Sequence, residues 1–313
     1  MNKLKVWLSG LLVVQVLLVT AIFIFSQTED KFADGEFLVP FSVDSVNKMV
    51  IESDDSSITL VNSEDGWLMP ESKNLPAHSG KVEFVLTDLH QLKNTWPITT
   101  TASAHDRFEV GEEVFKRRVT LFQDGRDEVV VYIGTSPSFR KSHFRPQGDD
   151  NVYAMNLNVN DFYDNPSDWL DKRLLAIEEP TEIQGADYVL VKQGDAWKIK
   201  KPGEEELLPA VTAKVEEITL AMAAMELLEI AEPSLIPDFS GEDYHQITVS
   251  KGEEQWVYDL KREVAEYFIK RNDIDEVFVM SKMDFKGMSK YSFKDLVASE
   301  SVKTSESSKD SAE

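Results

Sequence analysis

Apolar and polar residues alternate along most of this chain in patterns that predict short strands. The mostly apolar stretches 48–51 and 58–61, separated by the polar residues 54–57, are typical of strands joined by turns. The dipeptides Asp65-Gly66 and Asp124-Gly125 predict further turns. These segments therefore predict small antiparallel meanders.

Two segments change from the strand period to the helical period. Their apolar positions recur every three or four residues and predict amphipathic helices that pack on a sheet. The first helix carries Val82, Val85, Leu86, Leu89 and Leu92, and the second carries Val215, Ile218, Met222, Met225 and Leu228. Pro97 and Pro233 follow the two helices, and Ser79 and Thr212 are suited to be their N-cap residues.

One arrangement of strand, turn, tryptophan and helix occurs twice. Trp67 and Trp197 are 197 − 67 = 130 positions apart, and the tripeptides Leu75-Pro76-Ala77 and Leu208-Pro209-Ala210 are 208 − 75 = 133 apart. Self-similarity at a nearly fixed offset indicates two copies of one structural unit. We interpret Trp67, Trp197, Pro76 and Pro209 as core residues of this repeat.

An apolar run near the N-terminus predicts a membrane anchor. Val6 to Phe25 carries no charge and is long enough, at about 1.5 Å per residue, to cross a hydrocarbon core of about 30 Å. Lys3 and Lys5 precede the run, so the positive-inside rule leaves the N-terminus in the cytoplasm and exports the rest. A cleaved signal peptide is the alternative, although its apolar region spans only about 7–15 residues. The amide of Gln15 is expected to contact another helix within the membrane.

The strands that follow each helix complete the two modules. They are expected around 118–122, 128–133 and 152–155, and again around 246–249, 255–260 and 277–280. Runs of strands around one long helix predict an α+β fold. We therefore expect an N-terminal transmembrane helix followed by two tandem related modules, each an antiparallel sheet with one long amphipathic helix. The expected segments are an anchor at 1–26, a stalk at 27–37, module one at 38–175, module two at 176–297 and a disordered tail at 298–313.

Composition narrows the partners of the chain. The net charge of −23 argues against nucleic acid, because nucleic-acid binding relies on Lys and Arg at phosphates. The chain has no cysteine, which excludes disulfides and thiolate chemistry. The last residues are almost entirely polar and cannot bury enough apolar surface to offset chain entropy.

Motifs of catalysis or cofactor binding do not occur in the sequence. There is no GxGxxG or GxxxxGK[ST], and the five histidines form no HExxH or i, i+4 pair. The acidic stretches 149–151 and 273–276 lack the spacing of a calcium loop, so we interpret them as turns. No cofactor and no metal is therefore expected.

One local basic cluster stands out on an otherwise acidic chain. It consists of Arg140, Lys141, His143 and Arg145, in an expected loop that also carries Phe139 and Phe144. Such a loop could meet an anionic ligand, a lipid headgroup or an acidic partner, and the alternative is an ordinary surface loop.

The assembled pattern resembles the DUF4340 domain family. The resemblance rests on Trp67, residues 75–77, the first helix and the heptapeptide Trp169-Leu170-Asp171-Lys172-Arg173-Leu174-Leu175, and it covers about 37–297. Module two has only a loose echo of that heptapeptide, at 291–296. The resemblance implies an accessory protein, anchored by one helix and often encoded beside ABC-type transport components of the gliding-motility kind, with no established catalytic residues.

Three hypotheses of function follow from the sequence. The first is a non-catalytic, membrane-anchored periplasmic binding protein, single-pass in the inner membrane, whose partners are the permease and ATPase of an ABC-type complex. The second is an exported hydrolase or carbohydrate-acting enzyme that uses paired carboxylates. The third is a self-associating envelope scaffold.

Overall fold

The computed structural model describes residues 35–298, together with Trp7, Leu12, Gln15, Val19 and Thr20. Most of the expected anchor, the first part of the expected stalk and the tail beyond Ala298 lie outside the described residues. Among the residues that the structure describes, no helix is both long enough and apolar enough to cross a membrane.

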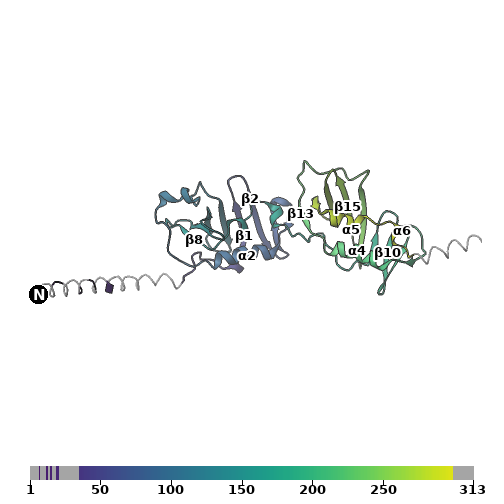
Figure 1. Cartoon of the computed structure of the whole chain (residues 1–313), viewed down its shortest axis with the longest axis horizontal. Coiled ribbons are helices and arrows are strands. Elements are labelled where there is room, and N and C mark those ends of the chain that lie inside the picture. Colours follow the sequence, from purple (N-terminus) through teal and green to yellow (C-terminus); the bar gives the residue numbers. More distant parts are fainter. Residues whose placement is uncertain (1–6, 8–11, 13–14, 16–18, 21–34, 299–313) are drawn as a thin grey trace, which may run out of the picture. The chain divides into compact units, whose positions relative to one another are not determined.

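The chain divides into two compact units, here called unit 1 and unit 2. Unit 1 runs to Trp169 and unit 2 begins at Leu170, six residues before the division expected after Leu175 (175 − 169 = 6) (Figure 1). The difference has a physical reason, because the carbonyl oxygen of Leu175 accepts a hydrogen bond from the buried Tyr258 hydroxyl of unit 2 at 2.8 Å.

Unit 1 contains one sheet and one long helix. Its strands are β1 (Val46–Glu52), β2 (Ser57–Ser63), β3 (Gly66–Met69), β4 (Leu75–Pro76), β5 (Arg117–Gln123), β6 (Val129–Ile133), β7 (Ser142–Pro146) and β8 (Tyr153–Met155). Its helices are η2 (Val43–Ser45), η3 (Pro70–Ser72), α2 (Ser79–His90), η4 (Ala102–Ala104), η5 (Asp106–Phe108), η6 (Val159–Asp161) and α3 (Pro166–Trp169). All strand pairs are antiparallel, in the order β4-β3-β2-β1-β5-β6-β7-β8.

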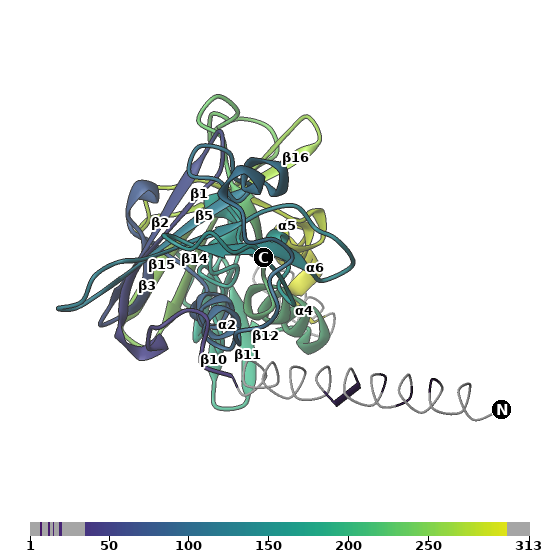
Figure 2. The same cartoon turned by 90° about the vertical axis from the view of Figure 1, so that its left-hand side faces the viewer.

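Unit 2 contains a second sheet and two helices of more than one turn. Its strands are β9 (Glu182–Gln184), β10 (Val189–Gln193), β11 (Ala196–Lys200), β12 (Leu208–Pro209), β13 (Leu227–Ile230), β14 (Tyr244–Lys251), β15 (Glu254–Glu263), β16 (Glu266–Arg271) and β17 (Phe278–Met280). Its helices are α4 (Thr212–Ala223), α5 (Lys282–Ser289) and α6 (Phe293–Leu296), which lie close together in both views (Figures 1 and 2). The antiparallel order is β12-β11-β10-β9-β14-β15-β16-β17-β13.

The two sheets share one strand order. Strands β9 to β12 take the places of β1 to β4, and β14 to β17 take those of β5 to β8. The additional strand β13 pairs with β17 at the sheet edge. Unit 1 has a remnant of this pairing, because the segment at Ile98 and Thr99 exchanges two backbone hydrogen bonds with Val152, which precedes β8. The predicted α+β class, with antiparallel sheets, is confirmed.

The apolar stripes of the two long helices lie against the sheets, as their period predicts. The buried residues are Val82, Val85, Leu86 and Leu89 on α2, and Val215, Ile218 and Met222 on α4. α5 packs closely on α4, since a Cβ atom added at Gly287 would lie 2.6 Å from the Cβ of Ala221. The predicted turns are also present, with Gly66 at a φ of 106° and Gly125 at 65°.

The predicted ends of the helices are wrong in two respects. The N-cap of α2 is His78, whose Nδ1 accepts from the Lys81 amide at 3.2 Å, and the N-cap of α4 is Val211, so Ser79 and Thr212 are first helical residues. The second helix ends at Ala223, and Leu228 is 53% exposed on β13. Pairing of β13 with β17 therefore overrides the helical period there.

Candidate functional site

The repeated tryptophans occupy equivalent strands. Trp67 lies on β3 and Trp197 on β11, and their carbonyl oxygens accept from the amides of Ala77 at 2.7 Å and Ala210 at 3.2 Å. Pro76 and Pro209 lie on the two-residue edge strands β4 and β12 that follow. The sequence repeat therefore corresponds to a repeated hydrogen-bonded corner.

The predicted core role of these four residues is only partly correct. Trp67 is 5% exposed and belongs to the core of unit 1. Trp197 and Pro76 are half-buried, and Pro209 is exposed. The prolines have no N–H to donate, so they are tolerated at a sheet edge, where side chains are covered on fewer sides.

A lysine in the first turn of α2 links this helix to the last residues of unit 1, a contact here called the closing contact. The Lys81 ammonium donates to the carbonyl oxygen of Asp168 and lies 3.9 Å from the centre of the Tyr163 ring. One residue later, the carbonyl oxygen of Trp169 accepts from the His78 amide at 2.7 Å. Burial lowers the pKa of Lys81, and the carboxylate of Asp168 partly offsets that effect.

Unit 2 has an equivalent closing contact, made by different side chains. Lys214, at 214 − 81 = 133 positions further on, donates to the carbonyl oxygen of Asp295 at 2.6 Å and lies 5.6 Å from the Tyr291 ring centre. The next carbonyl oxygen, of Leu296, accepts from the Val211 amide at 2.7 Å. Segment 291–296 is therefore a structural counterpart of the segment that ends at Trp169, whereas the sequence predicted it as a loose echo of the heptapeptide that begins at Trp169.

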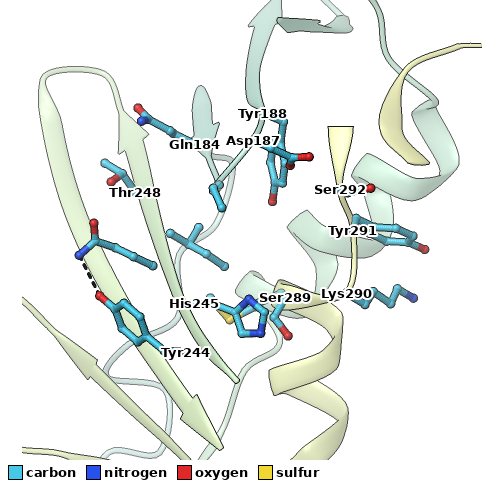
Figure 3. Close-up of a pocket in the computed structure, with 15 residues that line it drawn as sticks. Gln184, Asp187, Tyr188, Tyr244, His245, Thr248, Ser289, Lys290, Tyr291 and Ser292 are labelled. Carbon is cyan, nitrogen blue, oxygen red and sulfur yellow. Dashed lines mark hydrogen bonds between the residues drawn. The ribbon is translucent and has the colours of Figure 1, made fainter. Parts of the chain in front are cut away.

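A hollow of about 640 Å³ opens in unit 2, within the range of about 300–1,000 Å³ common for ligand sites. It lies between the turn that follows β9, the first half of β14 and the loop that joins α5 to α6 (Figure 3). The lining residues are Gln184, Gly185, Ala186, Asp187, Tyr188, Tyr244, His245, Gln246, Ile247, Thr248, Met288, Ser289, Lys290, Tyr291 and Ser292.

The hollow exists because β9 is shorter than its neighbour. β9 has three residues and pairs with β14 only at 248–250, whereas β14 has eight residues and pairs with β15 along its whole length. Residues 244–247 therefore extend beyond the end of β9 and form one wall. Gln184 and Thr248 mark the point where the pairing stops.

Hydrogen bonds fix the polar side chains of this wall. The Tyr244 hydroxyl donates to Asp259 Oδ1 at 2.5 Å, and the Gln246 amide donates to the same oxygen at 3.0 Å. Burial and the bond to Asp259 raise the pKa of Tyr244 to about 12. Burial alone would raise the pKa of Asp259, but the bonds from Tyr244 and Gln246 and the Lys270 charge lower it. Tyr244 is therefore neutral and Asp259 ionised at pH 7.

Most of the remaining lining is neutral at pH 7. Burial lowers the pKa of His245, although Asp243 partly offsets this, and the imidazole meets the Phe285 ring edge-on at 5.7 Å. Burial also raises the pKa of Tyr188 to about 12. The charge of Lys290 is balanced by Glu217 at 2.6 Å. The wall can therefore accept a polar ligand without burying an isolated charge.

Unit 1 has a smaller, more charged hollow at the equivalent place. It measures about 440 Å³ and is lined by the β1–β2 turn, the start of β5 and Asp164. Arg117 Nη2 lies 3.2 Å from Asp164 Oδ1, and the Ser56 hydroxyl donates to Asp164 at 2.7 Å. Burial tends to raise the pKa of Asp164, but bonds from Ser53 and Ser56 lower it, so this carboxyl is ionised at pH 7.

A third hollow, of about 630 Å³, lies elsewhere in unit 1. Its lining is Phe84, Asp88, Phe139, Arg140, Asn156, Leu157, Asn158 and Asp161. Phe139 is 89% exposed and Phe84 is 53% exposed. Burial and the Asp161 charge raise the pKa of Asp88, which brings one carboxyl of the hollow closer to its protonated form.

The predicted basic loop is wrong in its location. Residues 142–146 form β7, between β6 and β8, where His143 is 8% and Arg145 3% exposed. The Arg145 guanidinium donates to the Val110 carbonyl oxygen at 2.7 Å and lies over the Tyr132 ring. Arg140 lines the third hollow, and Lys141 is exposed. The four basic residues therefore do not share one surface, because β7 lies inside the sheet with both of its faces covered, which buries two of them.

Metal ligands do not cluster in residues 35–298. No group of three or more His, Asp or Glu side chains is placed there to hold a metal ion. The predicted turn at 149–151 is present, since Asp149 Oδ1 accepts from the Asn151 amide at 2.9 Å. In the second acidic stretch Asp273 pairs with Arg271 at 2.6 Å.

The lining of the unit 2 hollow was not found by sequence reasoning. Tyr188, Tyr244, His245 and Tyr291 lie on three different segments, and only His245 was considered, as one of five scattered histidines. One feature of the sequence could have indicated this site. The hairpin around Lys251-Gly252-Glu253-Glu254 has longer strands than the hairpin around Asp124-Gly125.

Comparison with protein families gives one match, and it crosses the division between the units. Residues 67–232, more than half of the 313, match the family described as "Domain of unknown function (DUF4340)". The matched segment begins at β3 and ends just beyond β13. Comparisons with curated proteins and with solved structures find no match. The chain belongs to the DUF4340 family.

Proposed function

We propose that this protein is a membrane-anchored, extracytoplasmic binding protein that serves an ABC-type transport or envelope complex as a non-catalytic accessory. The apolar run from Val6 to Phe25, with Lys3 and Lys5 before it, supports the anchor and the export of the remainder across the inner membrane. Permease and ATPase subunits are the expected partners.

The hollow of unit 2 is the observation that carries the binding role. Its wall presents hydroxyl, amide and imidazole groups at the end of a rigid sheet, which is how binding sites are commonly held. A second hollow at the equivalent place in unit 1 supports the view that the two units are tandem copies of one module whose sites have diverged.

Recovery of partners from the native membrane tests this role. The tagged full-length chain is solubilised in mild detergent and compared with a form that lacks residues 1–26 and is exported by a cleavable signal. We expect permease and ATPase subunits with the full-length chain. Their recovery with both forms would place the contact on the exported units. If neither form recovers membrane proteins, the transport role is wrong.

The anchor can be tested in the same experiment. Gln15 is expected to contact a helix of the partner, so Gln15→Leu should reduce recovery of the permease while leaving membrane insertion intact. Val14→Leu is the matched control, because it changes an apolar residue beside Gln15 without removing an amide. Equal recovery with both variants would exclude a role for the Gln15 amide.

The third hollow supports a second candidate function, an exported hydrolase that acts on carbohydrate. Asp88 and Asp161 line one hollow, and the raised pKa of Asp88 suits a proton donor. The test is hydrolysis of chitotetraose and cellotetraose by the full-length chain and by Asp88→Asn. Activity that Asp88→Asn abolishes would support the enzyme, and no hydrolysis by the unsubstituted chain would count against it.

A further inference from the structure

The first half of β14 presents one side of its backbone to the unit 2 hollow. In an antiparallel strand the N–H and C=O of one residue point to the same side, and successive residues alternate. The carbonyl oxygen of Ser250 accepts from Thr181, next to β9, whereas that of Asp243 accepts from Arg262, at the end of β15. Even-numbered residues of β14 therefore point toward β9, and odd-numbered ones toward β15.

The side that points toward β9 has no strand beside it at residues 244–247. Among residues 35–298, β9 alone pairs with this side of β14, and its last residue, Gln184, pairs with Thr248. The backbone N–H and C=O groups of Tyr244 and Gln246 consequently face the hollow. Figure 3 shows the opposite wall, formed by α5 and the segment through Tyr291.

We propose that an extended peptide segment of a partner protein binds in this hollow and adds a strand to β14. Unpaired donors and acceptors at strand spacing are matched by another extended backbone, which supplies acceptors and donors at the same spacing. The hollow of about 640 Å³ has room beside the edge, and its floor contains Ile247 and Met288, 3% and 1% exposed. An apolar side chain of the added strand would pack on that floor.

Charge favours a basic segment. Asp187 lines the hollow, whereas Asp243 and Asp259, beside the β14 wall, pair with Arg262 and Lys270, and the Lys290 charge is balanced by Glu217. The chain as a whole carries a net charge of −23. A segment with lysine or arginine at its ends and an apolar residue between them therefore complements the site.

Unit 1 does not offer such an edge at the equivalent place. β1 has seven residues and pairs with β5 from Glu52 and Arg118 to Val46 and Gln123. β5 starts at Arg117, only one residue before this pairing begins. The open edge is thus specific to unit 2, where β14 is longer than β9 by five residues (8 − 3 = 5).

This inference deepens the proposed function by naming the surface and the chemistry of the partner segment, and it is tested separately from the identity of the complex. A random dodecapeptide library displayed on phage is selected against the full-length chain in detergent micelles. The dissociation constants of the selected peptides are then measured by fluorescence polarisation. The membrane pull-down can fail while the peptides still bind the edge, so the two outcomes are distinguishable.

The decisive variant is Gln246→Pro, which removes the one N–H that faces the centre of the hollow. That N–H takes no part in the β14–β15 ladder, and proline is tolerated at strand edges, so the fold is expected to persist. We expect the selected peptides to bind at least tenfold more weakly. Gln246→Thr, which keeps the backbone amide, should change binding by about threefold or less. Circular dichroism checks that both variants are folded.

A change on the peptide gives the same test without altering the protein. The selected peptides are methylated at alternate backbone amides in two phases, either at the odd-numbered or at the even-numbered residues. One phase should abolish binding and the other should leave it nearly unchanged, because only every second residue of an added strand faces β14. Equal effects of the two methylation phases would overturn the proposal. So would a selection that yields no peptides, or peptides that bind Gln246→Pro as tightly as the native chain.

The chain's own C-terminal segment is the competing occupant. A form that ends at Ala298 should bind the selected peptides with unchanged affinity if the edge is open to a partner. If truncation increases the affinity for the selected peptides by tenfold or more, residues 299–313 compete for the edge, and the assignment to a partner segment is overturned.

Discussion

Units 1 and 2 keep the same strand order and the same closing contacts, but their strands end at different places. In each unit a lysine in the first turn of the long helix donates to a backbone carbonyl, and the next carbonyl receives the amide of the helix N-cap residue. By contrast, β1 covers the start of β5, whereas β9 stops four residues short of the start of β14 (248 − 244 = 4). The difference teaches that the relative lengths of paired strands decide whether this corner leaves a small hollow, as in unit 1, or an open strand edge, as in unit 2.

The closing contact uses backbone carbonyls, and this explains why it persists although the side chains around it differ. Trp169 in unit 1 and Leu296 in unit 2 are both 0% exposed, yet they differ in size and chemistry. A carbonyl acceptor is available whatever residue carries it. The apolar side chain that follows can therefore change while the hydrogen bonds remain.

The largest expected effect comes from truncating the buried side chains of Trp169 and Leu296 to alanine. Trp169→Ala removes a large side chain whose Nε1 donates to the Tyr163 carbonyl oxygen at 2.9 Å, and it should lower the stability of unit 1 by about 3–5 kcal/mol. Leu296→Ala should lower the stability of unit 2 by about 2–5 kcal/mol. Peptide-resolved hydrogen exchange in increasing urea measures both.

The control in this experiment is the other unit. If the units are independent, Trp169→Ala should increase exchange in peptides from β1 to β8 and leave those from β9 to β17 unchanged, and Leu296→Ala should do the reverse. Equal effects of each variant on both sheets would show that the two units unfold together.

The framework was largely predictable from the sequence because it rests on local signals. The helical stripe beginning at Val82, the turn glycine Gly66 and the repeated Leu-Pro-Ala tripeptides each act over a few residues, and they predicted most strands and both long helices. β7 was missed because Ser142, His143 and Arg145 are polar, although pairing on both sides buries them. Burial of polar residues depends on distant partners, so local patterns do not reveal it.

The second prediction concerns the closing lysines. Lys81→Met and Lys214→Met keep most of the aliphatic stem and remove one charged hydrogen bond each. Lys81→Met should cost about 1–2 kcal/mol, because the ammonium is partly buried and lies closer to its tyrosine ring, 3.9 Å against 5.6 Å for Lys214. Lys214→Met should cost about 1 kcal/mol or less. Urea unfolding measures both, and a larger cost for Lys214→Met would contradict the ranking.

The candidate site was not predictable because it depends on where strands stop. Tyr188, Tyr244 and Tyr291 come together only because β9 ends at Gln184 and the α5–α6 loop returns beside β14. The sequence predicted the second module without β9, β13 and β16, and therefore without the strand whose end opens the hollow. The site is defined by the relative lengths of paired strands, which tertiary pairing decides.

The third prediction compares the equivalent turns β6–β7 and β15–β16. Arg140 and Val264 both adopt left-handed backbone, with φ of 54° and 53°. This region is costlier for a β-branched residue, so Val264→Gly should stabilise unit 2 by about 1 kcal/mol, and Arg140→Gly should stabilise unit 1 by less. The midpoint of thermal unfolding measures the difference. Val264 is 87% exposed, so a loss of stability on Val264→Gly would mean that its side chain contributes more than its backbone strain costs.

The smallest expected effect is on pH dependence, and it distinguishes the two units by one histidine each. Burial lowers the pKa of His143 and of His245 below 6.5, so the unfolded chain binds more protons than the folded one as the pH falls below that value. Each histidine therefore leaves the stability of the fold unchanged above pH 6.5. Below that pH the stability falls, and the loss grows until the pH reaches the pKa of the folded state. His143→Gln should flatten this pH dependence for β1 to β8, and His245→Gln for β9 to β17, as measured by peptide-resolved exchange at pH 7.5 and 5.5 corrected for intrinsic rates. His143 lies 2.7 Å from the Thr135 hydroxyl within the sheet, whereas His245 lines the open hollow, so the flattening should be greater for His143→Gln. The reverse order would mean that His245 resists protonation more strongly than His143. The wall of the hollow would then be more desolvated than the exposure of its residues indicates.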